Sequence, residues 1–172
     1  MIMRKYLDKE DSCRLPILSP DELLLDITDI HENDLEEFAR QKYRELFIQS
    51  NGRGEHTLHD GEKVIFWETR FEHALYDAKE WQHSAVKDVL DKRRLERLAW
   101  VLPLLSGNMP TSECWMVTQG GRTKRFYVMP AKGFVVWLEP KSNGTWTFST
   151  GYDVSPAYIY QRTRGGRRLW KK

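Results

Sequence analysis

Cysteine is scarce in this chain, and it contains neither a long apolar run nor a recognisable leader. The two cysteines among its 172 residues, Cys13 and Cys114, are far apart and form no CxxC motif. A disulfide framework or a cysteine-based metal site is therefore not expected. No apolar run approaches the roughly 18–20 residues that span a bilayer. Residues 1–13 also lack the apolar centre of a signal peptide. We therefore expect a cytoplasmic protein with no membrane partner.

Net charge is also low, but its two signs are unevenly distributed. The formal net charge is +2. Residues 1–121 carry 16 Lys and Arg against 23 Asp and Glu, whereas residues 122–172 carry 11 against 2. A basic C-terminal part suits a polyanionic partner such as RNA or DNA. A basic tail that only aids solubility explains the same charge.

Hydrophobic residues recur with a helical period in the first two thirds of the chain. Each expected helix begins with a residue that can cap it, and two of the caps have Glu three residues later. The expected helices cover residues 33–47, 69–82 and 91–102, with Asn33, Thr69 and Asp91 as their caps.

After Pro103 the pattern changes to the alternation of β-strands. Turn residues at 119–122, 130–133 and 140–144 separate the strands, which predicts an antiparallel meander. The expected strands are 113–118, 123–129, 134–139 and 145–150, with a short strand at 63–67 and an edge strand or cover at 157–161. The predicted class is α+β, with N-terminal helices packed on a four-stranded antiparallel sheet. We expect an acidic helical appendage at 1–60 and a main domain at 61–172 with a basic tail.

His73 is the histidine most suited to chemistry. It lies among apolar residues on an expected helix, and an unperturbed imidazole pKa near 6.5 suits a proton-transfer group or a phosphate partner. A satisfied structural ring is the alternative. The other histidines, His31, His56, His59 and His83, lie in polar, loop-like contexts. No third ligand accompanies His56 and His59 at a sensible spacing, so no metal is expected.

Arg94 and Arg97 lie about one helical turn apart, so both side chains point the same way. Two guanidinium groups on one side of a helix suit a phosphate, because each offers a planar fork of donors. An exposed basic stripe paired with nearby acids explains the spacing as well. At the end of the last strand, Ser149 and Thr150 place hydroxyl groups that can donate to a phosphate.

Three short motifs, FEHA at 71–74, RLERLAW at 94–100 and FSTGY at 148–152, follow in this order. Together they resemble phage-type members of the barnase, EndoU, colicin-nuclease and RelE-like group of endoribonucleases. The resemblance covers residues 63–155. In that group the strand usually continues Thr-Ala-Tyr or Thr-Ala-Phe, whereas here Gly151 stands before Tyr152. It is therefore open whether Ser149 or Thr150 supplies the matched hydroxyl.

The resemblance implies a barnase- or RelE-like fold and metal-independent cleavage of RNA by its own 2′-hydroxyl. It also implies a phage or mobile-element toxin or effector without a cofactor, with RNA and a cognate inhibitor or immunity protein as partners. The implied catalytic residues are His73, Arg94, Arg97 and Thr150. The expected RNA contacts are Ser149, Tyr152 and Trp100, together with four arginines of the basic C-terminal part, Arg162, Arg164, Arg167 and Arg168.

Two other functions fit the sequence. One is a nucleic-acid-binding module without catalysis, which uses the basic tail together with Trp137, Trp146 and Trp170 as a stacking surface. The other is a structural or interaction protein of a phage that keeps only the fold, since fold does not determine function.

Overall fold

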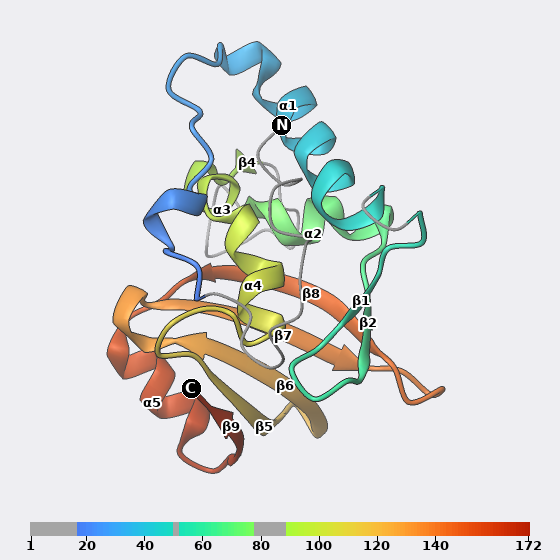
Figure 1. The fold of residues 1–172 in the computed structure, drawn as a ribbon, viewed down its shortest axis with the longest axis vertical. Helices are drawn as coiled ribbons and strands as arrows, with labels where there is room; N and C mark the ends of the chain where they lie inside the picture. The colour runs from blue at the N-terminus through green and yellow to red at the C-terminus, as the bar shows by residue number, and fades with distance from the viewer. Residues whose placement is uncertain (1–16, 50–51, 78–88) are drawn as a thin grey trace, which may run out of the picture.

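The computed structural model describes residues 17–49, 52–77 and 89–172, which place a helical layer on one face of a curled sheet (Figure 1). The α-helices are α1 (Leu35–Tyr43), α2 (Phe71–Leu75), α3 (Lys92–Glu96), α4 (Val101–Leu105) and α5 (Pro156–Thr163). Turns of 3-10 helix cover Asp21–Leu23, Glu32–Asp34, Glu68–Arg70, Leu98–Trp100 and Pro130–Lys132, and α1 continues as a π-helix over Arg44–Ile48. The strands are β1 (Glu55–Thr57), β2 (Lys63–Ile65), β3 (Tyr76–Asp77), β4 (Val89–Leu90), β5 (Glu113–Gln119), β6 (Arg122–Met129), β7 (Phe134–Pro140), β8 (Trp146–Asp153) and β9 (Arg167–Lys171).

The main sheet has seven strands in the order β1-β2-β8-β7-β6-β5-β9. Its neighbours pair antiparallel except β2 and β8, which are parallel. Four of the strands lie where the alternation at 113–150 places them. The predicted four-stranded antiparallel sheet of a barnase- or RelE-like fold is nevertheless wrong. The molecule is α+β, but β1, β2 and β9 extend the meander into a larger mixed sheet.

Aromatic side chains join the helical layer to the sheet. The ring of Phe47 stacks on Phe66 with centroids 4.4 Å apart, and Phe66 stacks on Phe148 of β8 at 4.7 Å. All three rings are buried. Such aromatic pairs contribute about 0.5–1.5 kcal/mol beyond the area they bury. This column therefore holds the π-helix that follows α1 against β8 of the sheet, and residues on both sides of position 60 share one core.

The opposite face of the sheet, which we call the outer face, is covered in part by α5. Tyr158 and Ile159 of α5 pack on a second apolar cluster that includes Phe126 and Trp137. The strand or cover expected at 157–161 is therefore a helix. Ser155 explains the difference, because its side chain accepts a hydrogen bond from the Tyr158 N–H and Pro156 occupies the first helical position.

The two middle helices are shorter than predicted. The helix expected over 69–82 begins as a 3-10 turn and continues as α2, after which the chain turns into β3 at Tyr76; residues 78–82 lie outside the described residues. Asp91 caps α3 as predicted, accepting from the N–H groups of Arg93 and Arg94. At Arg97 the backbone leaves the α-helical region, so the helix expected over 91–102 is interrupted there.

The first helix has a different cap from the one expected. The side chain of His31, rather than that of Asn33, accepts a hydrogen bond, and its donor is the Asn33 N–H at the start of a 3-10 turn. α1 then follows directly from this turn at Leu35. The capping-box pattern therefore placed the helix correctly and misassigned its first residue.

Candidate functional site

The predicted catalytic residues gather along the second half of β8. β2 pairs with β8 only through Val64 to Trp146 and Ile65 to Thr147. Beyond Thr147, α2 and α3 pack beside β8 in place of a strand. Because these two helices carry His73 and Arg94, and Arg97 directly follows α3, the order of the chain brings all three motifs to one edge.

His73 lies next to Ser149. His73 Nε2 is 3.3 Å from Ser149 Oγ, a hydrogen-bond distance, and the imidazole is exposed while Ser149 is buried. A β-bulge between Trp137 and Leu138 makes this possible: Trp137 pairs with Thr150 and Leu138 with Phe148, which leaves Ser149 as the extra residue. Bulges commonly redirect one side chain of a strand, and this one brings the hydroxyl beside α2.

Thr150 and Tyr152 also adjoin the helices. Thr150 Oγ1 is 3.5 Å from the Ala74 carbonyl oxygen, to which it donates at the limit of hydrogen-bond length. Tyr152 OH lies 2.7 Å from Tyr158 OH and accepts a hydrogen bond from Trp137 Nε1. Burial and the bond to Tyr158 raise the pKa of Tyr152 above its usual value. Of the two candidate hydroxyls, Ser149 is therefore the one that contacts the histidine.

Arg94 is largely buried and has several acceptors. Its guanidinium donates to the Tyr76 carbonyl oxygen and lies 3.2 Å from Asp91 and 3.5 Å from Asp77. It also stands over the Tyr152 ring at 5.2 Å, within range of a cation–π interaction. Its positive charge is therefore placed beside β8 and partly balanced by carboxylates.

Arg97 contacts Asp153, the residue of β8 that follows Tyr152 and faces the opposite side of the strand. Its Nε is 3.1 Å from Asp153 Oδ1, and its Nη1 is 3.4 Å from Glu96. Burial raises the pKa of Asp153, while the positive charge of Arg97 opposes that rise. Successive residues of a strand face opposite sides, so Arg94 at Tyr152 and Arg97 at Asp153 do not share a described partner.

Trp100 is not available to RNA in this structure. Its side chain is 2% exposed, and its indole N–H donates to the Pro20 carbonyl oxygen at 2.7 Å. The ring also packs edge-to-face on Phe134. A buried indole that is bonded in this way leaves no face for a stacked base, so we leave Trp100 out of the candidate site.

The four arginines of the basic C-terminal part belong to ordered elements. Arg162 of α5 stands over the Tyr158 ring at 4.9 Å, which connects α5 to Tyr152. Arg164 directly follows α5, and Arg167 and Arg168 begin β9 at the far edge of the sheet from β1. The part that the sequence presents as a tail is thus a helix and an edge strand, and only its helical portion adjoins the site along β8.

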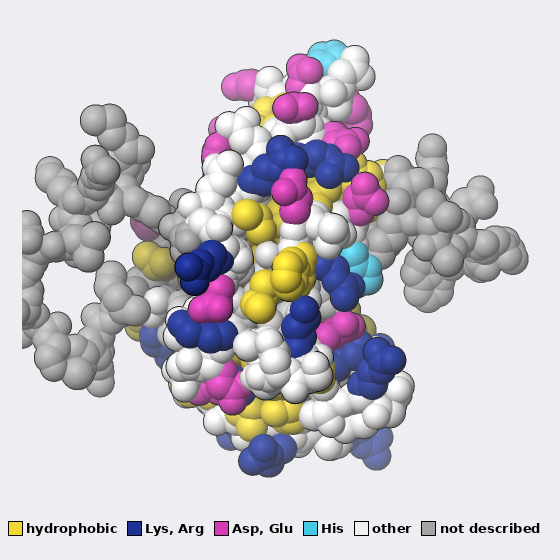
Figure 2. All heavy atoms as spheres, turned by 90° about the vertical axis from the view of Figure 1, so that its right-hand side faces the viewer, with side chains coloured by type: hydrophobic (Ala, Val, Ile, Leu, Met, Phe, Trp, Pro, Cys, Tyr) yellow, Lys and Arg dark blue, Asp and Glu magenta, His cyan; other side chains and the backbone are white. Residues whose placement is uncertain are grey.

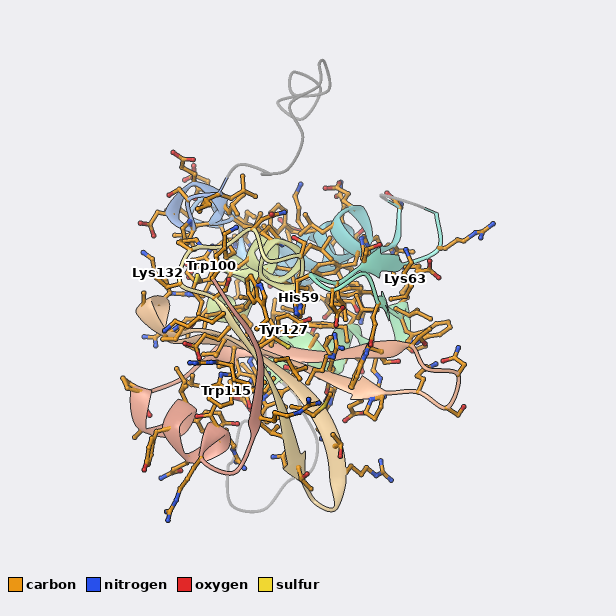
Figure 3. The ribbon with its side chains drawn as sticks, turned by 60° about the horizontal axis from the view of Figure 1, so that its bottom comes forward. His59, Lys63, Trp100, Trp115, Tyr127 and Lys132 are labelled. Carbon is orange, nitrogen blue, oxygen red and sulfur yellow. The ribbon has the colours of Figure 1, made fainter. Side chains whose placement is uncertain are left out.

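A second polar cluster was missed by the sequence analysis. Arg125 is buried within β6, where it lies 2.7 Å from Asp60 and 3.0 Å from Glu62. His59 Nδ1 lies 2.8 Å from the Tyr127 hydroxyl, and Figure 3 shows the two residues side by side. The sequence signal for this cluster was Arg125, which stands directly before the apolar residues Phe126–Met129 of β6. We read this cluster as the anchor that holds the turn at 58–62 against the sheet.

Among the described residues, no three His, Cys, Asp or Glu side chains come together in a way that could hold a metal ion. Within the same residues, no helix has the length and apolar character needed to cross a bilayer. Cys114 is buried and unbridged, and burial raises its thiol pKa to about 12. Cys13 and His83 lie outside the described residues.

Comparison with known proteins adds no family to this geometry. No protein-family model, curated protein sequence or solved structure matches the chain. The functional argument therefore depends on the site itself.

Proposed function

We propose that this protein is a metal-independent endoribonuclease whose site lies along the second half of β8. The observation that carries the proposal is the 3.3 Å contact between His73 Nε2 and Ser149 Oγ, with Arg94 on the same strand edge at Tyr152. The three short motifs supply these residues. A titratable ring, a hydroxyl and fixed cations are the groups that this chemistry uses.

The proposed reaction forms a bond between the 2′-oxygen and the adjacent phosphorus and breaks the bond from phosphorus to the 5′-oxygen. The products are a 2′,3′-cyclic phosphate and a free 5′-hydroxyl. The 2′-hydroxyl loses one proton and the leaving 5′-oxygen gains one, so no proton is consumed overall. We assign His73 to proton transfer and Ser149 to holding the imidazole. Thr150 orients the phosphate.

The proposed role of Arg94 and Arg97 is to stabilise negative charge on the nonbridging oxygens. Arg94 is held by Asp91 and by the Tyr76 carbonyl, so it needs little reorganisation when that charge develops. Arg97 lies farther along β8, paired with Asp153. We therefore rank Arg94 above Arg97 as the cation nearest the reacting phosphate.

One observation favours a second function, an RNA-binding module without catalysis. Each of the two arginines already has a carboxylate within 3.2 Å, which reduces the charge left for a phosphate. A binding module needs only surface cations and aromatic rings. In either case we propose a cytoplasmic protein with RNA as its partner. We further propose that the nuclease is a phage or mobile-element toxin, held in check by an inhibitor protein.

The test is cleavage of an end-labelled RNA by wild type and by His73→Ala and Arg94→Ala. Loss of the proton-transfer group should lower the rate by about 10²–10⁴-fold, and loss of the cation by about 10²–10³-fold. Wild-type cleavage should persist in excess EDTA and leave a cyclic phosphate, while DNA stays intact. His31→Ala, at an exposed histidine before the 3-10 turn that leads into α1, is the matched control and should cut at the wild-type rate.

Circular dichroism must show that each variant remains folded. Cleavage by both variants at the wild-type rate, or its loss in EDTA, would overturn the proposed site. Binding of RNA without cleavage by wild type would favour the binding module. Failure to bind or cut any RNA or DNA would favour a structural role.

A further inference from the structure

Toward the β1–β2 end, the outer face of the sheet extends beyond α5. α5 packs on the half around Phe126 and Trp137, and in Figure 1 it lies under the opposite end of the sheet from β1 and β2. By the alternation of strands, the residues that continue this face are Lys124 on β6, Glu139 on β7 and Thr147 on β8. Lys124 and Glu139 are partly exposed there, whereas Thr147 is buried.

Trp67 is the large aromatic ring exposed at this end. It directly follows β2, and its side chain is 44% exposed, whereas the preceding Phe66 is buried in the core. Its backbone is fixed, because its carbonyl oxygen accepts a hydrogen bond from the buried Tyr43 hydroxyl at 3.0 Å. Lys141 Nζ stands over one part of the ring at 4.6 Å from its centroid. A rigid, half-exposed indole beside a cation suits stacking with a base.

Cations also border the adjoining hollow. A cavity of about 310 Å³ is lined by Arg122, Thr123, Lys124, Glu139 and Pro140. Glu139 links the hollow to the tryptophan side, since it lies 3.3 Å from Lys124 and 3.8 Å from Arg70. Arg70 and Lys124 thus pair with Glu139, Arg122 lines the hollow, and Lys141 stands over Trp67. Figure 2, which looks onto the β1–β2 side, shows hydrophobic side chains surrounded by Lys and Arg together with Asp and Glu.

We infer that this surface is a subsite for single-stranded RNA, with a base stacked on Trp67 and a neighbouring phosphate at Arg122 and Lys124. The inference rests on the proposed function for the identity of the nucleic acid. Its position relative to the site follows from the sheet: Trp67 continues β2, which runs parallel to β8, and at about 3.3 Å per residue it lies near the level of Ser149. In this proposal, an RNA strand bound at His73 extends onto this surface.

The experiment measures binding apart from cleavage. A fluorescein-labelled ten-nucleotide RNA with 2′-O-methyl groups cannot undergo the proposed reaction, so fluorescence anisotropy reports affinity alone. Trp67→Ala should weaken binding about 5- to 100-fold, as loss of one stacked base does. Trp67→Phe, which keeps an aromatic ring, should weaken binding less than Trp67→Ala does. Tyr160→Ala, at an exposed aromatic residue of α5, is the matched control and should bind as wild type does.

The phosphate contact is tested by salt. Each neutralised phosphate contributes about −0.7 to the slope of log K against log salt for a single strand. Arg122→Gln combined with Lys124→Gln should therefore make the slope less negative by roughly 1.4, whereas Trp67→Ala should leave it unchanged. Unchanged affinity in Trp67→Ala and Trp67→Gln, or an unchanged slope in the double variant, would overturn the subsite.

The subsite and the proposed nuclease can fail separately. Cleavage of unmodified RNA together with wild-type affinity in the Trp67 variants would remove the subsite and leave the nuclease. Binding that depends on Trp67 without any cleavage would remove the nuclease and leave the subsite. Equal affinity for a DNA probe of the same sequence would overturn the assignment to RNA.

Discussion

His59 is the residue through which the fold should respond to mild acid. Its imidazole contacts the Tyr127 hydroxyl and lies 5.0 Å from the Trp170 ring. Burial lowers the pKa of His59 below its usual value near 6.5, while the charge of Asp60 opposes this shift. The unfolded chain therefore binds a proton at this position at a higher pH than the folded chain does. The contribution of neutral His59 to the free energy of unfolding is therefore present above about pH 6.5 and is lost as the pH falls below that value.

We predict that the urea midpoint of the wild type falls between pH 7.5 and pH 5.5, and that His59→Gln shows a smaller fall. Glutamine can keep a hydrogen bond to Tyr127 but does not titrate. Comparison of the two proteins at pH 8, where the histidine is neutral in both states, measures any difference in packing. Parallel curves for the two proteins from pH 7.5 to 5.5 would contradict the role of His59.

Residues of the candidate site were predictable as chemical types but not in their contacts. The sequence indicated His73, two arginines and a strand hydroxyl, and all lie along β8. The bulge that selects Ser149 depends on pairing between β7 and β8, which no local pattern encodes. The carboxylates beside the arginines were partly foreseeable: Asp91 and Glu96 are close in sequence, whereas Asp153 reaches Arg97 only through the fold.

At the scale of elements, β9 is the feature that most changes how the basic C-terminal part should be tested. β9 pairs with β5, and Leu169 and Trp170 pack against the main core. Deletion of residues 162–172 would therefore remove part of the fold together with the charges. Charge and structure must be changed separately.

We predict that Trp170→Ala lowers the free energy of unfolding by about 2–4 kcal/mol, since it removes a large ring from a packed position. Arg167→Gln and Arg168→Gln should change it by less than about 0.5 kcal/mol, because both side chains are exposed. Urea unfolding of the three variants makes the comparison. An equal decrease in the free energy of unfolding for the tryptophan and arginine variants would show that β9 stabilises the fold through its charges.

Elements with a local signal were predicted better than elements that depend on distant pairing. The hairpins of β5 to β8 have turn residues between alternating strands and lie where predicted. α5 has the Ser-Pro start of a helix, but its run of Tyr158, Ile159 and Tyr160 was interpreted as an edge strand or cover. The parallel pairing of β2 with β8 joins segments about 80 residues apart, and together with the pairings of β1 and β9 it makes the predicted four-stranded sheet wrong.

At the scale of the whole molecule, one core links segments from both halves of the chain. Tyr43 and Phe47 are fully buried against Phe71 and Phe66, and they belong to the same cluster as the inner side chains of the sheet. A chain limited to 61–172 would lack those rings and expose their partners. The described part of residues 1–60 therefore contributes directly to the folding of the rest.

We predict that residues 61–172 alone do not form the native packing, whereas the full chain unfolds in one cooperative transition. Near-ultraviolet circular dichroism of the shorter chain should lack the tertiary signal of the full chain. Tyr43→Ala in the full chain should cost about 3–5 kcal/mol, as loss of a buried aromatic ring does. A well-ordered 61–172 fragment would instead support the domain boundary expected near residue 60.

The short β2–β8 pairing has a consequence for self-association. Beyond Thr147, the backbone groups on one side of β8 face helices instead of another strand, and exposed strand edges of this kind recruit strands from other molecules. α2 and α3 act as a cover, and the bulge at Ser149 interrupts the straight edge that a foreign strand would need. A change that loosens α2 without unfolding the sheet should therefore cause aggregation before it causes loss of secondary structure. Light scattering during mild heating would detect such early assembly.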